Sequence, residues 1–225
     1  MSIKKRNGNL CVYCGNAATT RDHVPPKGIF LEPRPHNLIT VPACNECNGG
    51  FSEDDEKFRN YVSFAVSADN KFSATNEQRR LLDQSAMRGM RRSPKKAPAP
   101  AGLVNILTQE GKRQLLTGKI SRDVIERVAA RIVKAFYFHE CRYIINLACE
   151  FEISLMDPFK SDVFGLMRQM PMKGGSIGGE EIFSYQFGIM IGNPDVSLWI
   201  FDFYRNLKIG VITGVNYLSN GAANP

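Results

Sequence analysis

The chain lacks any long apolar run. None of its hydrophobic stretches approaches the roughly 18 residues that a membrane-spanning helix needs. Residues 1–10 are basic and also lack the apolar stretch of a secretory signal peptide. These two absences predict a cytoplasmic protein with no membrane segment.

Cysteine is too sparse, and too unevenly spaced, for a secreted disulfide scaffold. The 225 residues contain six cysteines, of which four stand in two close pairs. Cys141 and Cys149 lie in apolar stretches, where we expect them to be packing residues. This usage is typical of a reducing compartment, where close cysteine pairs bind metal more often than they oxidise.

Two further patterns are missing. The glycine-rich segment at residues 173–179 lacks the lysine and hydroxyl order of a phosphate-binding loop, so we predict a flexible loop there. No internal repeat is apparent, which leaves an ordinary globular chain. Its 43% hydrophobic residues are enough for a sizeable core.

Basic residues are in excess, and the excess is confined to one half of the chain. Lys and Arg number 29 against 22 Asp and Glu, for a net charge of +7. Residues 1–101 hold 16 basic and 10 acidic side chains, whereas residues 102–225 hold 13 and 12. The N-terminal half is therefore the part that we expect to meet a polyanion such as nucleic acid.

The two cysteine pairs are the most specific signal in the sequence. Cys11 and Cys14 are separated by two residues, as are Cys44 and Cys47. Each such pair can bind one side of a tetrahedral Zn²⁺, and two pairs complete its coordination. We therefore predict a structural zinc ion, which leaves any chemistry to other residues.

Polar residues of a different kind lie between and just after the cysteine pairs. Asp22 and His23 are adjacent, Asn37 precedes the second pair, and Asn48 follows it directly. Carboxylate and amide oxygens suit a hard divalent cation, and an imidazole with an ordinary pKa near 6.5 suits a general base.

With these residues in this order, the segment from about residue 8 to 70 resembles the zinc-stabilised HNH endonucleases. The resemblance rests on the cysteine pairs, the run DHVPPK at residues 22–27, the run NLITVPAC at residues 37–44, and Asn48 after Cys47. It implies a treble-clef scaffold that carries a ββα-metal active site. Asn48 in the third signature position makes this an H-N-N variant, similar to the phage junction-resolving branch.

The resemblance also implies residue roles. His23 would be the general base that activates water, and Asp22 and Asn48 would bind a catalytic Mg²⁺ or Mn²⁺. Asn37 would brace the loop that holds His23. Arg21 and Lys27 flank these residues and would contact phosphate. The expected activity is hydrolysis of phosphodiester bonds in nucleic acid, with DNA as the expected substrate.

A second function remains open. The cysteine pairs could form a non-catalytic zinc module that binds nucleic acid or a protein partner. The other two histidines do not separate these alternatives, because His36 is expected on a surface loop and His139 in a core or at its edge.

A basic run allows two interpretations of its own. It is either a solvated linker or a segment that follows a phosphate backbone. Its cations are Arg88, Arg91, Arg92, Lys95 and Lys96.

The overall prediction is an α+β chain in three parts. Residues 1–75 form the zinc module, residues 76–102 a basic helix and a Pro/Ala linker, and residues 103–225 an α+β domain of unknown role. That last domain would choose the substrate or mediate a homodimer or contact with a partner subunit.

Residue patterns predict the individual elements. In the first half we expect a strand at 38–41, a helix from Ser52 to about residue 68 with Asp55 completing a capping box, and a helix at 76–92. The acidic residues 53–56 then fit the dipole of the helix start better than a second metal site. In the second half we expect a hairpin of 103–108 and 114–117, a helix at 122–145 capped by Ser121, and an antiparallel meander of 183–191, 196–204 and 207–213 packed on that helix.

Overall fold

The computed structural model describes residues 9–68, 99–108, 111–155 and 170–215, and single positions at 81, 84, 87, 88, 91, 165 and 168. Within this part the chain is α+β, as predicted. An N-terminal hairpin with four clustered cysteines is followed by helices and by a five-stranded antiparallel sheet.

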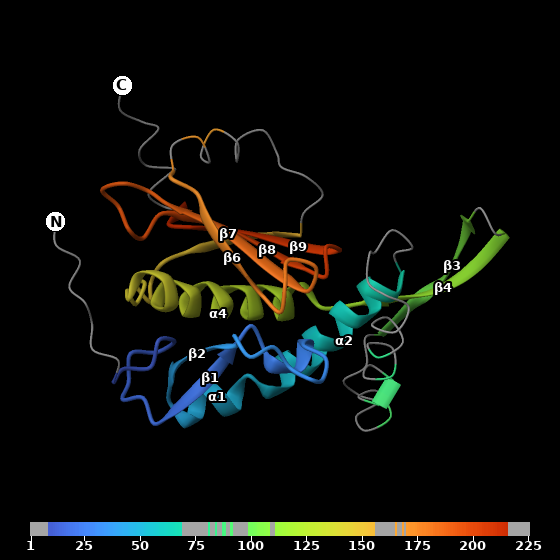
Figure 1. Cartoon of the computed structure of the whole chain (residues 1–225), viewed down its shortest axis with the longest axis horizontal. Coiled ribbons are helices and arrows are strands. Elements are labelled where there is room, and N and C mark those ends of the chain that lie inside the picture. The colour runs from blue at the N-terminus through green and yellow to red at the C-terminus, as the bar shows by residue number, and fades with distance from the viewer. Residues whose placement is uncertain are drawn as a thin grey trace.

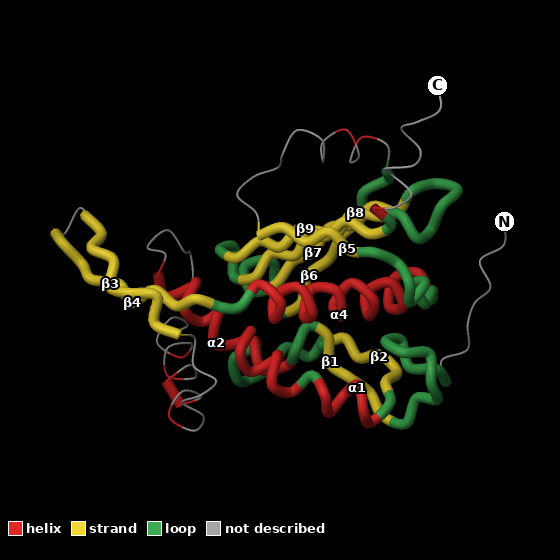
Figure 2. Tube along the Cα trace, turned by 180° about the vertical axis from the view of Figure 1, so that it is seen from behind, coloured by secondary structure: helices red, strands yellow, loops and turns green. Residues whose placement is uncertain are grey.

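The elements form three layers, with the helix α4 (Arg122–Cys141) in the middle (Figure 1). The sheet lies on one side of α4, and the N-terminal hairpin and its helices lie on the other. The view from behind shows the same order (Figure 2). The helix contacts strands of both outer layers, so it links the N-terminal layer to the sheet.

The N-terminal layer is built on a short hairpin. The strand β1 (Thr20–Val24) pairs antiparallel with β2 (Ile39–Ala43), and the 3-10 helix η1 (Lys27–Ile29) lies between them in sequence. Two helices follow directly, α1 (Asn45–Gly50) and α2 (Ser52–Ala68). The predicted strand and helix are both confirmed in this layer, but the capping box is not: Ser52 is the first residue of α2, and the side chain of Asp55 binds Arg131 of α4.

A second hairpin extends away from the body of the molecule (Figure 1). Its strands are β3 (Ala99–Thr108) and β4 (Gly111–Lys119). The hairpin was predicted, but it is longer than expected and begins inside the predicted linker. The predicted helix at 76–92 lies mostly outside the described residues; of it the structure describes residues 81, 84, 87, 88 and 91, all helical.

The long helix α4 begins where predicted and ends earlier. Ser121 occupies its N-cap position but makes no side-chain capping bond; its backbone oxygen accepts from the N–H of Val124 at 3.1 Å. Arg142 follows the helix with φ +54°, and a left-handed residue ends a helix. The helix therefore stops at Cys141 and does not reach residue 145.

The five-stranded sheet has the order β5-β9-β8-β7-β6. The predicted meander is confirmed as β7 (Phe183–Ile189), β8 (Ser197–Phe203) and β9 (Leu207–Thr213). Two strands that the sequence pattern did not indicate form the edges, β5 (Phe151–Leu155) and β6 (Lys173–Ile177).

The strand β6 corrects the prediction of a flexible glycine loop. A Cβ on Gly174 would lie 2.5 Å from the backbone oxygen of Tyr185, and one on Gly175 would lie 2.7 Å from the hydroxyl of Tyr185. The glycines are therefore needed for close approach to the neighbouring strand β7, and not for flexibility.

A single apolar cluster fills the space between the layers. It contains Val41 of β2, Phe58 of α2, Phe136 of α4 and Trp199 of β8, all fully buried. The ring of Phe136 contacts several aromatic side chains of the sheet, the nearest being Tyr185 at 4.5 Å between centroids. The core is thus continuous from the cysteine cluster to the sheet, while the predicted division into three parts stays a prediction.

In the described part of the chain, no helix is both long and apolar enough to span a bilayer.

Two ion pairs hold α4 against α2, and they use the acidic residues at the start of α2. Arg127 binds Asp54 through two hydrogen bonds of 2.7 and 2.9 Å, and Arg131 binds Asp55. Arg131 also approaches Asp22, with Nε 4.0 Å from Oδ2. The carboxylates of α2 therefore act between helices, in addition to lying at the helix N-terminus.

These two arginines give a matched test of stability. Arg131→Met should lower the free energy of unfolding by about 3–5 kcal/mol, because the buried Asp22 and the partly buried Asp55 would lose the cation beside them. Arg127→Met should cost about 1 kcal/mol or less, because the Arg127 side chain is 56% exposed. Urea unfolding followed by circular dichroism measures both changes. Equal losses would contradict the special role given to Arg131.

Candidate functional site

The four cysteines of the two pairs come together in space. The sulfur atoms of Cys11, Cys14, Cys44 and Cys47 all lie within 4.8 Å of one another. The sulfurs of Cys14 and Cys44 are 3.7 Å apart. Tetrahedral Zn–S bonds of about 2.3 Å require sulfurs about 3.8 Å apart, so the cluster fits a zinc ion.

Backbone hydrogen bonds hold the first cysteine pair in a tight knuckle. The N–H of Cys11 donates to Asn16 at 2.7 Å, and the N–H of Gly15 donates back to Cys11 at 2.9 Å. Gly15 has φ +78°, a conformation that other residues rarely adopt. The N–H of Val12 donates to Pro42 of β2 at 3.1 Å, which attaches the knuckle to the hairpin.

The second pair lies at the start of α1. Cys44 is the N-cap residue, and its sulfur accepts from the N–H of Cys47 at 3.4 Å. This hydrogen bond lowers the pKa of the Cys44 thiol, because it stabilises the thiolate. A thiolate is the form that binds zinc, so the helix start favours metal binding.

Asp22 and His23 point to opposite faces of β1. Asp22 lies opposite Val41 and is 6% exposed, so its carboxylate faces the interior. His23 lies opposite Thr40 and is partly exposed on the outer face. The alternation of side chains along a strand requires this separation.

The buried carboxylate of Asp22 has two neighbours. The hydroxyl of Tyr13 donates to Oδ2 at 2.7 Å, and Nε of Arg131 lies 4.0 Å from the same oxygen. The other oxygen, Oδ1, makes no hydrogen bond within the described part of the chain. Of the buried donors on Arg131, Nε and Nη1 have no hydrogen-bond partner there.

Aromatic contacts fix the surroundings of this carboxylate. The ring of Phe51 meets the ring of Tyr13 edge-on, with centroids 5.1 Å apart. The guanidinium of Arg131 stacks over the same Phe51 ring at 4.5 Å. We call Asp22, Tyr13, Arg131, Asp55 and Phe51 the Asp22 network. Burial raises the pKa of Asp55 even though Arg131 favours its charged form.

His23 lies among cations. Partial burial lowers its pKa below the ordinary value, and the positive charges of Lys27 and Arg34 lower it further. The carboxylate of Asp22 opposes this effect without reversing it. The imidazole is therefore neutral at pH 7 and can accept a proton.

Asn48 reaches back from α1 to β1. Its amide nitrogen donates to the hydroxyl of Thr20 at 3.1 Å and to the backbone oxygen of Arg21 at 3.3 Å. Its oxygen makes no hydrogen bond within the residues that the structure describes. The structure therefore brings Asn48 against the strand that carries Asp22 and His23.

The resemblance implied that Asn37 braces the loop that holds His23, and the structure shows its side-chain amide bound to the five-stranded sheet side of the molecule. Its amide nitrogen donates to the backbone oxygen of Ser176 at 3.1 Å, and its oxygen accepts from the N–H of Gly178 at 3.2 Å. The amide thus joins the N-terminal layer to the end of β6. This partner lies 139 residues away in the chain, so the sequence pattern could not reveal it.

The structure describes some of the residues that were predicted to contact phosphate, and not others. Arg21 and Lys27 are exposed, but the guanidinium of Arg21 is bound to Thr40 of β2 by two hydrogen bonds of 2.9 Å. Arg88 and Arg91 are exposed and helical. The remaining cations of the basic run, Arg92, Lys95 and Lys96, lie outside the described residues.

The remaining histidines and cysteines are placed largely as expected. His36 is exposed, and His139 lies at the edge of the core with 38% of its side chain exposed. Cys149 is buried and Cys141 is partly buried.

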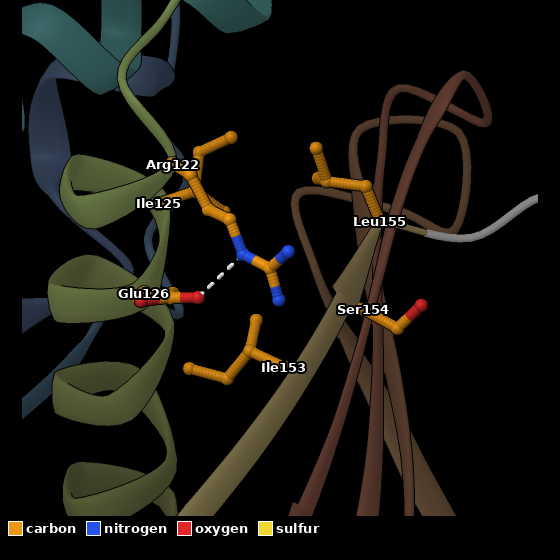
Figure 3. A pocket seen from close by; sticks show the side chains of 6 residues that line it. All are labelled: Arg122, Ile125, Glu126, Ile153, Ser154 and Leu155. Atoms are coloured by element: carbon orange, nitrogen blue, oxygen red, sulfur yellow. Dashed lines mark hydrogen bonds and ion pairs between the residues drawn. The ribbon is translucent and has the colours of Figure 1, made fainter.

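Two cavities lie away from the cysteine cluster. One, of about 260 Å³, separates the start of α4 from β5; there Arg122 binds Glu126 at 2.7 Å, opposite Ile153 and Leu155 (Figure 3). The other, of about 520 Å³, is lined by His36 and Asn37 among others. Asn37 is the one predicted site residue that lines either of these two cavities, so neither cavity is a pocket for His23.

No family model, curated protein sequence or solved structure matches the chain. The geometry of the cysteine cluster and its neighbours therefore carries the functional argument alone.

Sequence reasoning missed four residues around the site. Tyr13 and Arg131 belong to the Asp22 network, Asp55 pairs with Arg131, and Arg34 acts on His23. Arg131 had a visible signal, because it interrupts the apolar face of a helix that is otherwise lined by Val128 and similar residues. Arg34 had none, since only the fold brings it near His23.

Zinc binding can be tested with matched cysteine variants. The purified protein should contain one zinc ion per chain, and Cys44→Ser should lose most of it, because the thiolate set would be incomplete. Cys149→Ser, a buried cysteine outside the cluster, should keep its zinc. Metal analysis by mass spectrometry measures both variants, and equal zinc contents would contradict the four-sulfur site.

The pKa of His23 can be tested directly by NMR. Lys27→Ala should raise it, because a nearby positive charge that disfavours the imidazolium is removed. With only three histidines in the chain, the ring C–H signals can be assigned and followed against pH in zinc-loaded protein without other divalent ions. His36 and His139 serve as internal controls. An unchanged or lowered pKa of His23 would show that Lys27 does not act on it.

Proposed function

We propose that the protein is a metal-dependent endonuclease of the HNH type, which hydrolyses phosphodiester bonds of nucleic acid. DNA is the expected substrate. In this proposal the zinc ion is structural, and the finer fold of the N-terminal layer is the treble clef of that family. His23 is the general base, and Asp22 and Asn48 are the residues that hold a catalytic divalent cation.

One observation carries this proposal. A zinc-type cysteine cluster joins an antiparallel hairpin to the helix that follows it, with Asp22 and His23 on the hairpin and Asn48 on the helix. Asn48 also contacts the strand, because its amide nitrogen donates to the backbone of Arg21, the neighbour of Asp22. This is the strand–strand–helix order that the resemblance implies.

The donor atoms suit a hard cation. Asp22 and Asn48 each have one oxygen without a hydrogen bond in the described part of the chain, and Mg²⁺ commonly takes few protein oxygens and keeps several waters. When bound, such a cation would offset the negative charge that builds on the phosphate during attack. Its ligands would come from two elements that the cysteine cluster joins.

His23 supplies proton transfer in this proposal. Attack on phosphorus requires a water molecule that loses a proton, and the neutral imidazole on the outer face of β1 can accept it. The lowered pKa keeps that nitrogen unprotonated at pH 7. His23 is partly exposed to solvent, so a polynucleotide backbone can reach it.

Exposed cations around His23 favour a phosphate-containing substrate. Lys27 and Arg34 act on the imidazole through their charges, and both are exposed. They can bind the phosphates on either side of the scissile bond, which holds the strand against β1. Arg34 also pairs with Glu32 at 2.8 Å and would exchange this partner for phosphate.

One observation favours the second function, a zinc module that binds nucleic acid without cleaving it. The Asp22 carboxylate already has a hydrogen bond and a guanidinium nearby. These two partners can hold the buried carboxylate without a divalent cation. Tight DNA binding with no cleavage in Mg²⁺ or Mn²⁺ would support this alternative.

Plasmid nicking decides between the two. The wild type should nick supercoiled DNA in Mg²⁺ or Mn²⁺, and His23→Ala should slow this by about 10²–10⁴-fold, the usual loss on removing a general base. His36→Ala, an exposed histidine outside the proposed mechanism, should keep the wild-type rate. Zinc content and circular dichroism should be unchanged in both. Equal nicking by His23→Ala and the wild type would remove His23 from the mechanism.

A further inference from the structure

Tyr13 stands at the junction of the zinc knuckle and the Asp22 network. It lies between Cys11 and Cys14 and is 7% exposed. The hydrogen bonds of the knuckle fix its backbone, and the edge-on contact with Phe51 fixes its ring. Its hydroxyl is therefore held in one place, 2.7 Å from Oδ2 of Asp22.

The hydrogen bond constrains how the Asp22 carboxylate is turned. One oxygen is held by the phenol, and the guanidinium of Arg131 lies near the same oxygen. The second oxygen, Oδ1, has no partner in the described part of the chain. A carboxylate that is anchored at one oxygen presents the other in a defined direction, so the network orients Asp22.

The phenol suits this task because it is neutral. A tyrosine hydroxyl is uncharged near neutral pH and donates one hydrogen bond, here to Oδ2 of Asp22 at 2.7 Å. A neutral donor holds an oxygen without competing for its charge, whereas a second guanidinium in contact would weaken the attraction for a cation.

We propose that Tyr13 is a positioning residue, which holds Oδ2 of Asp22 so that Oδ1 faces the divalent cation of the active site. This inference rests on the proposed function and extends it. It makes the structural zinc site and the catalytic site one unit, because the residue that orients the metal-binding carboxylate lies inside the zinc knuckle. Arg131 of α4 places a positive charge near the same buried carboxylate, with Nε 4.0 Å from Oδ2.

The test is divalent-ion binding, measured apart from activity. Mn²⁺ serves as the probe, and electron paramagnetic resonance counts its free fraction in zinc-loaded full-length protein. Tyr13→Phe keeps the ring and removes only the hydroxyl. It should weaken Mn²⁺ binding by about 10–100-fold, which is the usual effect of removing a partner of a ligating carboxylate.

A matched control removes the same kind of bond elsewhere. The hydroxyl of Tyr143, which follows the C-terminus of α4, donates to Asp195 at 3.0 Å and not to Asp22. Tyr143→Phe should leave Mn²⁺ affinity unchanged, even if it lowers stability. Nicking rates at increasing Mn²⁺ add a second readout: Tyr13→Phe should need more Mn²⁺ for half-maximal rate and should approach the wild-type rate at saturation.

Asp22→Asn separates the failure of this inference from that of the proposed function. If the wild type does not bind Mn²⁺, or if Asp22→Asn binds it as tightly as the wild type, the metal site of the proposed function is absent. If Asp22→Asn abolishes binding but Tyr13→Phe binds as tightly as the wild type, the positioning role is wrong and the proposed function stands.

A second variant covers the case in which Tyr13→Phe loses zinc or secondary structure. Phe51→Leu removes the ring that holds Tyr13 in place but keeps the hydroxyl and the carboxylate. It should also weaken Mn²⁺ binding, by less than a complete loss of the hydrogen bond. Wild-type affinity in Phe51→Leu would overturn the proposal in that case.

Discussion

Four cysteine sulfurs that all lie within 4.8 Å of one another can together hold one cation, and without a cation thiolates at that distance would repel each other. The rest of the N-terminal layer depends on this constraint. The strands β1 and β2 have five residues each, and α1 has six. Elements this short bury little apolar surface by themselves. The cysteine cluster joins the knuckle, the hairpin and α1, and thereby sets the places of Asp22, His23 and Asn48 relative to one another.

The N-terminal layer also depends on packing against the helix α4. Its fully buried residue Phe136 packs on the sheet, while Arg131 faces the opposite layer and pairs with Asp55. A guanidinium with 3% exposure is stable there only because carboxylates lie beside it. The region after residue 120 therefore contributes directly to the candidate site, by supplying the charge that Asp22 faces. A role for this region in substrate choice or in assembly stays a prediction.

The two predicted site residues of β1 lie on opposite faces of the strand. The inner face carries Asp22, enclosed by Tyr13 and near Arg131, and the outer face carries His23 among exposed cations. In the proposed function, this division separates the carboxylate that would bind the cation from the imidazole that would accept a proton from water. Strand alternation produces it from two adjacent residues. Asn48 then approaches from α1, held by the backbone of the same strand.

The sequence by itself determined the local features. Cysteine spacing predicted the metal cluster, and periodic apolar residues predicted α2, the start of α4 and the strands β7, β8 and β9, because these signals depend on neighbours along the chain. Only the tertiary structure decided which distant groups meet: Asn37 with Ser176, Arg131 with Asp55, and Arg34 near His23. The tertiary structure also showed that the glycines expected in a loop lie in the edge strand β6, where they allow close approach to Tyr185 of β7. Contacts of this kind depend on how layers pack against each other, which no short window of residues contains.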